Sequence, residues 1–135
     1  MTGDIVLDAS YLLALVMGDE PTPAQAEKVV VAARLLAPAI WPLEVANTLL
    51  VNQRRGRINA VQLQNLVDVI AALNVQVMTP PALSIGHWCQ FAGAQGLTTY
   101  DAQYLDLAIQ QRCGIATCDG RLAQAASRCG LPVYS

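Results

Sequence analysis

The chain has 135 residues, a length that accommodates one hydrophobic core and is too short for two. Hydrophobic residues make up 54% of it and charged residues only 13%, against roughly 25% charged residues in an average soluble domain. The formal net charge of −2 argues against strong non-specific binding of nucleic acid by the chain as a whole, although it leaves room for a local basic site. We therefore expect a single domain over residues 1–135, with apolar surface that a partner or a second copy covers; a homodimer is the default expectation.

No segment of the sequence has the pattern of a membrane span or a secretory signal. No apolar run reaches the roughly 18 residues that a spanning helix needs, and the start of the chain lacks the basic residues of a signal peptide. The four cysteines form no Cys-x-x-Cys pair and have no histidine at zinc-finger spacing. We expect a cytoplasmic protein that does not associate with membranes and keeps its thiols reduced.

Short apolar strands alternate with helices along the chain. Strands are expected at residues 5–7, 39–41, 75–78, 115–118 and 131–134. Helices are expected at residues 9–17, 23–36, 42–54, 60–73, 82–95 and 100–112, with a final short helix that ends at Ser127. Pro38 is expected to end the second helix, and breaker residues at 18–21 and 80–81 separate other elements. This order predicts an α/β fold with three layers, in which a short, mainly parallel central sheet lies between helices.

Capping residues mark the expected ends of the later helices. Thr99 has the side chain of an N-cap for the helix 100–112, and Asn59 has that of an N-cap for the helix 60–73. Gly114 is expected just beyond the C-terminus of the helix 100–112, where a left-handed conformation favours glycine.

The helices 42–54 and 60–73 are joined by a short turn and should form an αα-hairpin. Three of the eight basic residues, Arg54, Arg55 and Arg57, fall at its tip. A guanidinium group presents a planar fork of donors that suits phosphate oxygens. The same arginines could instead stabilise the end of a helix, where positive charge meets the negative pole of the dipole. Both interpretations stay open.

Two aspartates, Asp8 and Asp119, each follow a short apolar strand. Because ligands bind beyond the carboxyl ends of parallel strands, both carboxylates are expected at one edge of the sheet. Taken alone, Asp8 is better explained as the N-cap of the helix that follows it. Glu44 and Asp101 lie in the first turns of two further helices and can reach the same edge.

Four carboxylates that converge without a counter-charge would repel one another. A divalent metal resolves this repulsion, and oxygen ligands suit Mg²⁺ or Mn²⁺, whereas the chain has no His or Cys set for zinc. Such metals activate water and neutralise charge during attack on a phosphodiester, so phosphodiester hydrolysis is the expected chemistry. Three further polar residues are placed to support the metal-bound water or a phosphate: Ser10, Asn47 and Thr117.

Together these motifs carry a resemblance to a known family. The segments concerned are Val6-Leu7-Asp8-Ala9-Ser10, Trp41-Pro42-Leu43-Glu44-Val45-Ala46-Asn47, Leu97-Thr98-Thr99-Tyr100-Asp101-Ala102 and Thr117-Cys118-Asp119. In this order and spacing they resemble the PIN-domain ribonucleases, and most of all the toxins of VapBC-type toxin–antitoxin pairs.

The resemblance implies an endoribonuclease that depends on Mg²⁺ or Mn²⁺. It matches four residues of this sequence to the acidic quartet of that family: Asp8, Glu44, Asp101 and Asp119. It further implies an RNA substrate, a dimer, and a small cognate antitoxin encoded beside the protein. The arginines at the hairpin tip are then the main candidates for holding RNA: Arg54, Arg55 and Arg57.

Two other functions compete with this one. A catalytically silent interaction module of the same fold would be expected to have lost an acid, and none is missing. A receiver or small phosphatase needs a lysine near the site or an Asp-x-Asp nucleophile, and the only lysine is Lys28, in a different helix. Asp106 lies five residues after Asp101 and should point away from it, and the tyrosines are interpreted as core or interface residues.

Overall fold

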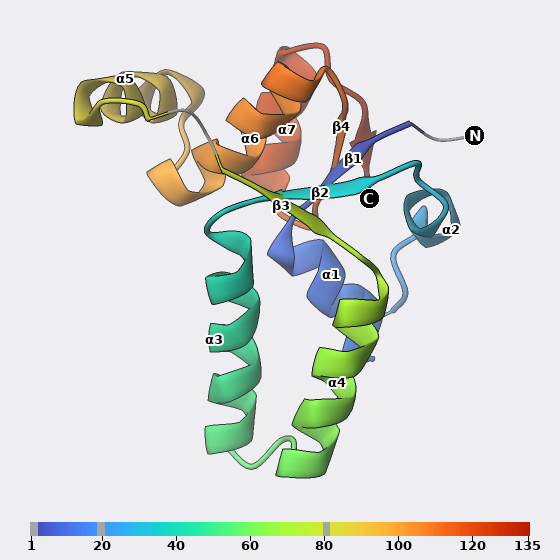
Figure 1. Cartoon of the computed structure of the whole chain (residues 1–135). Helices are drawn as coiled ribbons and strands as arrows, with labels where there is room; N and C mark the ends of the chain where they lie inside the picture. The colour runs from blue at the N-terminus through green and yellow to red at the C-terminus, as the bar shows by residue number, and fades with distance from the viewer. Residues whose placement is uncertain (1–2, 19–20, 80–81) are drawn as a thin grey trace.

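A five-stranded parallel sheet forms the middle of the computed structural model, which describes residues 3–18, 21–79 and 82–135 (Figure 1). The strand order is β3-β2-β1-β4-β5, and every neighbouring pair is parallel. The strands are β1 (Ile5–Leu7), β2 (Leu35–Pro38), β3 (Gln76–Met78), β4 (Gly114–Ala116) and β5 (Val133–Tyr134). The first strand of the chain is therefore the central one.

Helices cover both faces of this sheet (Figure 1). Below it in the figure lie α1 (Ala9–Val16), α3 (Trp41–Arg54) and α4 (Ala60–Ala72). Above it lie α5 (Ile85–Gln95), α6 (Thr99–Gln111) and α7 (Gly120–Arg128), while the short α2 (Ala26–Val30) lies at the side. The three-layer α/β/α arrangement predicted from the sequence is confirmed.

The core forms where β1 is covered on both faces. All three residues of β1 are fully buried, as is expected for a central parallel strand that has helices on each side. Tyr11 and Leu12 of α1 pack into the core from one layer, and Leu105 of α6 packs into it from the other. The buried strand β1 therefore fixes the position of the residues that directly follow it in the chain.

The prediction of a helix over residues 23–36 and a strand over 39–41 is wrong. The helix here is only α2, and β2 occupies Leu35–Pro38, whose residues are buried beside β1 and β3. Residues 39–40 form a turn that leads directly into α3. The error has a physical cause, because periodicity alone cannot separate a short, fully buried apolar strand from a buried helical segment.

Two predicted ends of α6 are also wrong by one or two residues. The N-cap is Thr98, whose hydroxyl accepts a hydrogen bond from the backbone N–H of Asp101. The left-handed residue at the other end is Arg112, with φ of 51°, and Gly114 lies inside β4. A Cβ atom on Gly114 would lie 2.8 Å from the ring of Tyr134, so glycine is required there for close packing of β4 and β5.

The predicted αα-hairpin is confirmed. In α4, Asn59 accepts a hydrogen bond from the backbone N–H of Gln62, and the Gln62 side chain accepts one from the backbone N–H of Asn59. The helices α3 and α4 pack against each other and against α1 (Figure 1). Parts of the predicted breakers, residues 19–20 and 80–81, lie outside the described residues. Within the described ranges, no helix is both long and apolar enough to cross a bilayer.

Candidate active site

Asp8 lies where β1 ends, opposite Thr117 on the neighbouring chain segment. The register aligns Leu7 with Ala116, and the Asp8 backbone N–H donates to the Ala116 carbonyl at 3.0 Å. The carboxylate oxygen Oδ2 accepts hydrogen bonds from Ser10 Oγ at 2.6 Å and Thr117 Oγ1 at 2.7 Å. Although Asp8 occupies the N-cap position of α1, its side chain makes no capping hydrogen bond. The pairing of β1 with β4 thus brings Thr117 to Asp8, and Ser10 reaches Asp8 locally, from the first turn of α1.

The environment of Asp8 favours its protonated form. The residue is only 6% exposed, and this burial raises the pKa of its carboxyl group. The hydrogen bonds from Ser10 and Thr117 lower the pKa in part, and the charge of Asp119 raises it again. A buried carboxylate with a raised pKa beside other carboxylates is typical of functional sites.

Asp119 takes the capping role that the sequence suggested for Asp8. Its Oδ1 accepts hydrogen bonds from the backbone N–H groups of Arg121 at 2.9 Å and Leu122 at 3.3 Å, at the start of α7. Its own backbone N–H donates to Thr117 Oγ1 at 2.9 Å. Because Thr117 also donates to Asp8, one hydroxyl group links the two acids.

Glu44 is held by a tyrosine that the sequence analysis did not select. The hydroxyl of Tyr104, a fully buried residue of α6, donates to Glu44 Oε1 at 2.5 Å. Burial raises the pKa of Glu44, the Tyr104 bond lowers it, and the charges of Asp8 and Asp101 raise it further. Burial, followed by the bond to Glu44, raises the pKa of Tyr104 well above its ordinary value. A signal for Tyr104 was present, because it lies three residues after Asp101 on the same helix and such residues are neighbours on the helix surface.

Asp101 lies in the first turn of α6, where the Thr98 cap holds its backbone. Burial raises the pKa of its carboxyl group, and the charges of Asp119 and Asp8 raise it further. The four predicted acids are therefore close enough to act on one another electrostatically. We call the group formed by Asp8, Glu44, Asp101 and Asp119 the acidic edge.

The donor chemistry of the acidic edge fits a hard divalent cation. All four side chains offer oxygen, and their mutual repulsion is the kind that Mg²⁺ or Mn²⁺ would relieve. As the side chains stand, however, no group of three or more His, Cys, Asp or Glu residues in the described part of the chain is arranged to hold a metal ion. Binding would therefore require the carboxylates to draw closer around the ion.

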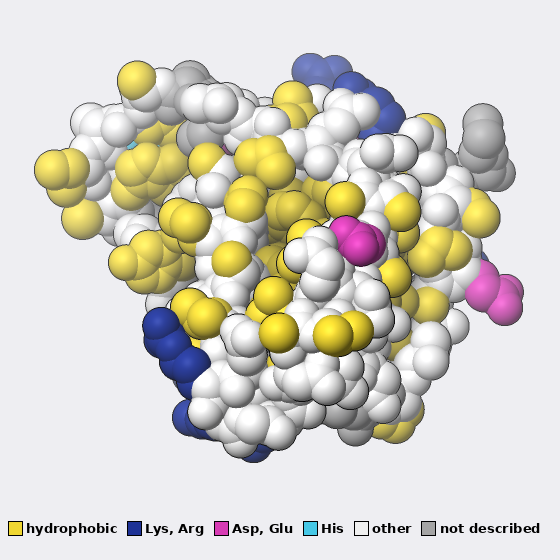
Figure 2. Space-filling model, turned by 60° about the horizontal axis from the view of Figure 1, so that its bottom comes forward, with side chains coloured by type: hydrophobic (Ala, Val, Ile, Leu, Met, Phe, Trp, Pro, Cys, Tyr) yellow, Lys and Arg dark blue, Asp and Glu magenta, His cyan; other side chains and the backbone are white. Residues whose placement is uncertain are grey.

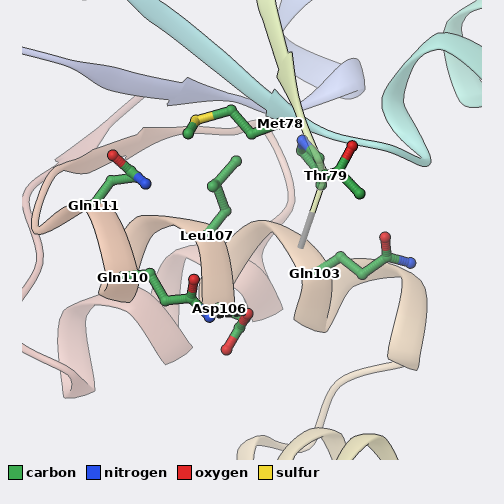
Figure 3. Close-up of a pocket in the computed structure, with 8 residues that line it drawn as sticks. Met78, Thr79, Gln103, Asp106, Leu107, Gln110 and Gln111 are labelled. Carbon is green, nitrogen blue, oxygen red and sulfur yellow. Dashed lines mark hydrogen bonds between the residues drawn. The ribbon is translucent and has the colours of Figure 1, made fainter. Parts of the chain in front are cut away.

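Asp106 lies away from the acidic edge, whereas the supporting role of Asn47, three residues after Glu44 on α3, stays a prediction. Asn47 is exposed on α3, and no side-chain hydrogen bond connects it to the four acids within the described residues. Asp106 lines a small hollow of about 40 Å³ between α6 and the end of β3, where it accepts a hydrogen bond from Gln110 Nε2 at 2.9 Å (Figure 3). Burial raises the pKa of Asp106, and the charge of His87 lowers it in part. The expectation that Asp106 points away from Asp101 agrees with this placement.

The three arginines lie, as expected, at the turn between α3 and α4, and all three are exposed. They do not share one environment. Arg57 lines a groove that also reaches Ser10, whereas Arg54 and Arg55 do not line it.

Comparisons with known proteins agree with this fold. The family model for the PIN domain matches residues 5–127. The crystal structure of PAE2754 from Pyrobaculum aerophilum superposes with a TM-score of 0.68 at 22% sequence identity, covering 90% of this chain and 78% of that chain. A PilT N-terminus domain protein, SSO1118 from Sulfolobus solfataricus P2, gives a TM-score of 0.48 at 11% identity, covering 97% and 85%. At such low identity the first of these similarities shows the fold alone. A comparison with curated protein sequences finds no match.

Proposed function

The chain belongs to the PIN domain family, whose members are generally nucleases, and we propose that it is a metal-dependent endoribonuclease and the toxin of a toxin–antitoxin pair. The observation that carries this proposal is the acidic edge, in which the carboxyl pKa values of Asp8, Glu44 and Asp101 are each raised by burial and further by the charge of at least one other of the four acids. Repulsion between carboxylates destabilises the folded chain, and a bound cation would offset it, so such a cluster is typical of a cation-binding site.

The roles of the side chains follow from their contacts. Mg²⁺ or Mn²⁺, when bound, would activate water and neutralise charge on the phosphodiester. Asp8, Glu44, Asp101 and Asp119 would hold the ion. Ser10 and Thr117 orient the Asp8 carboxylate, and Tyr104 orients that of Glu44.

The partners belong to the same proposal. The hairpin helices α3 and α4 expose large apolar side chains, among them Leu43 at 68% and Val61 at 70%. Figure 2, which turns the lower side of the molecule toward the viewer, shows hydrophobic side chains spread over this face and few charged ones between them. Apolar surface of this extent favours a partner that covers it. We assign it to a homodimer contact and to a small antitoxin, within the cytoplasm.

The test is cleavage of RNA by the purified chain with Mg²⁺, with Mn²⁺ and with a chelator. We expect cleavage only with metal, and loss of cleavage in Asp8→Asn and Asp101→Asn. Asp68→Asn, at an exposed carboxylate of α4, is the matched control and should cleave like the parent. If Asp8→Asn or Asp101→Asn cleaves as fast as the parent, the acidic edge is not the active site.

The alternative is a silent PIN domain that only binds a partner protein. Such a protein would leave RNA intact with either metal while still forming a stable complex with the product of a neighbouring small gene. Light scattering after gel filtration tests the dimer, because the 14.4 kDa chain and its dimer differ twofold in mass.

A further inference from the structure

A groove of about 440 Å³ lies beside the acidic edge, between α1 and α3. Its α1 wall is formed by Leu13, Ala14 and Met17, and its α3 wall by Thr48 and Asn52. We call it the α1–α3 groove. Its volume falls within the range of roughly 300–1,000 Å³ that is usual for small-ligand sites.

One residue that lines the groove also contacts the acidic edge. Ser10 lines the groove and at the same time donates to Asp8 Oδ2 at 2.6 Å. The Ser10 hydroxyl also accepts a hydrogen bond from the backbone N–H of Cys118, which lines the groove as well. A ligand in the groove would therefore contact Ser10, the residue whose hydroxyl holds the Asp8 carboxylate.

The charge of the groove has the opposite sign to that of the acidic edge. Among the residues that the structure describes, Arg57 lines it and no acidic residue does. The backbone N–H of Arg57 donates to the Asn52 carbonyl at 2.9 Å, which fixes the residue at the end of α3. Among the described residues, the Arg57 guanidinium makes no ion pair with an acid, so its donors are available to a phosphate.

We propose that the α1–α3 groove binds the nucleotide next to the phosphate that is cut. The base and ribose would lie against the apolar α1 wall, and Arg57 would bind the backbone phosphate. Arg57, rather than Arg54 or Arg55, is then the arginine that holds RNA. This inference rests on the proposed ribonuclease function and assigns part of its substrate site.

The first test measures binding of a short fluorescent RNA to the full chain in a chelator, by anisotropy at several salt concentrations. Arg57→Ala should weaken binding about tenfold and reduce the salt slope by about one. Lys28→Ala, which removes an equal charge from exposed α2, should stay within about twofold of the parent. If Arg57→Ala binds like the parent, or if Lys28→Ala weakens binding as much, the proposal is overturned. It is also overturned if the double variant Arg54→Ala with Arg55→Ala, and not Arg57→Ala, reduces the salt slope of RNA binding.

The second test fills the groove without changing any charge. Ala14→Leu should raise KM for RNA several-fold and leave kcat and Mn²⁺ affinity near those of the parent, because the added atoms displace a nucleotide and not the ion. Circular dichroism checks that Ala14→Leu and Arg57→Ala are folded. If the parent cleaves RNA and both folded variants keep its KM, the groove assignment fails while the ribonuclease function stands. If the parent neither cleaves nor binds RNA, both proposals fail.

Discussion

At the end of β1 the carboxylate of Asp8 accepts two hydroxyl hydrogen bonds, whereas at the end of β4 the carboxylate of Asp119 accepts two backbone N–H hydrogen bonds. Both acids follow an apolar strand and precede a helix. The difference comes from the residues that follow. Two residues after Asp8 stands Ser10, whose hydroxyl donates to the carboxylate, whereas two residues after Asp119 stands Arg121, whose backbone N–H donates to the carboxylate. One acid is thereby buried in a side-chain network, and the other is part of a helix terminus.

The two ends still share one property. In each aspartate, a single oxygen accepts both hydrogen bonds, Oδ2 in Asp8 and Oδ1 in Asp119. The second oxygen of each accepts no side-chain hydrogen bond among the described residues.

The largest expected effect is on catalysis. Asp8→Asn should slow single-turnover RNA cleavage by about 100-fold or more, equivalent to about 2.7 kcal/mol of transition-state stabilisation. Asp119→Asn should lose less, about tenfold, because asparagine keeps the helix cap at this position. Rates at saturating Mn²⁺ measure both. Equal losses would mean that the different surroundings of the two acids have no bearing on the chemistry.

The next effect concerns the hydroxyl that links the two ends. Thr117→Val is nearly isosteric but leaves the buried Asp8 carboxylate without one donor and the Asp119 N–H without its acceptor. We expect a loss of about 1–3 kcal/mol in the free energy of unfolding. Urea denaturation measures it, with Thr99→Val on the exposed start of α6 as the control. A Thr117→Val chain as stable as the control would show that the two aspartates are not linked through Thr117.

A smaller effect separates capping from charge at Asp119. Asp119→Ala removes the cap of α7 and should cost about 1 kcal/mol of stability, whereas Asp119→Asn should cost far less, because asparagine caps as well as aspartate does. The same pair at Asp8 should not follow this order, since Asp8 makes no capping bond. Thermal unfolding of the four variants without metal measures these differences in stability. If Asp119→Asn is as unstable as Asp119→Ala, the capping role of Asp119 is contradicted.

The smallest expected effect is the pH dependence of stability. Because the pKa of Asp101 is raised in the folded chain, the native state holds its proton more tightly than the unfolded state does. This contribution to stability is present below the unfolded pKa and is lost as pH rises through the folded pKa. In a chelator, Asp101→Asn should therefore unfold a few degrees above the parent at neutral pH, with a smaller difference near pH 4. If the difference in unfolding temperature between Asp101→Asn and the parent does not change with pH, repulsion between Asp101 and the other acids is contradicted.

Much of the fold could be predicted from the order of strands and helices, and one element could not. The predicted position of β2 and the predicted length of α2 were wrong because Leu36 continues the helical spacing of residues 26–33. Only pairing with β1 on one side and β3 on the other makes this segment a strand. Such pairing joins residues far apart in sequence, which local patterns do not reveal.

For the site, the acids were predictable and the groups that hold them were predictable only in part. Ser10 and Thr117 lie two residues from an acid, so alternation and spacing were sufficient to select them. Tyr104 was interpreted as a core residue, which its complete burial supports, yet its hydroxyl contacts Glu44. A side chain can belong to the core and also contact a site residue. The contact between Tyr104 and Glu44 depends on how close α6 lies to α3, which the sequence does not reveal.

The bond between Tyr104 and Glu44 joins helices that belong to opposite layers of the molecule, α6 above the sheet and α3 below it (Figure 1). Any partial opening that moves α3 away from the sheet breaks this bond and takes Glu44 away from the other acids. Docking of the hairpin and assembly of the acidic edge are then a single cooperative event. Amide hydrogens in the first half of α3 should accordingly exchange more slowly once Mn²⁺ is added.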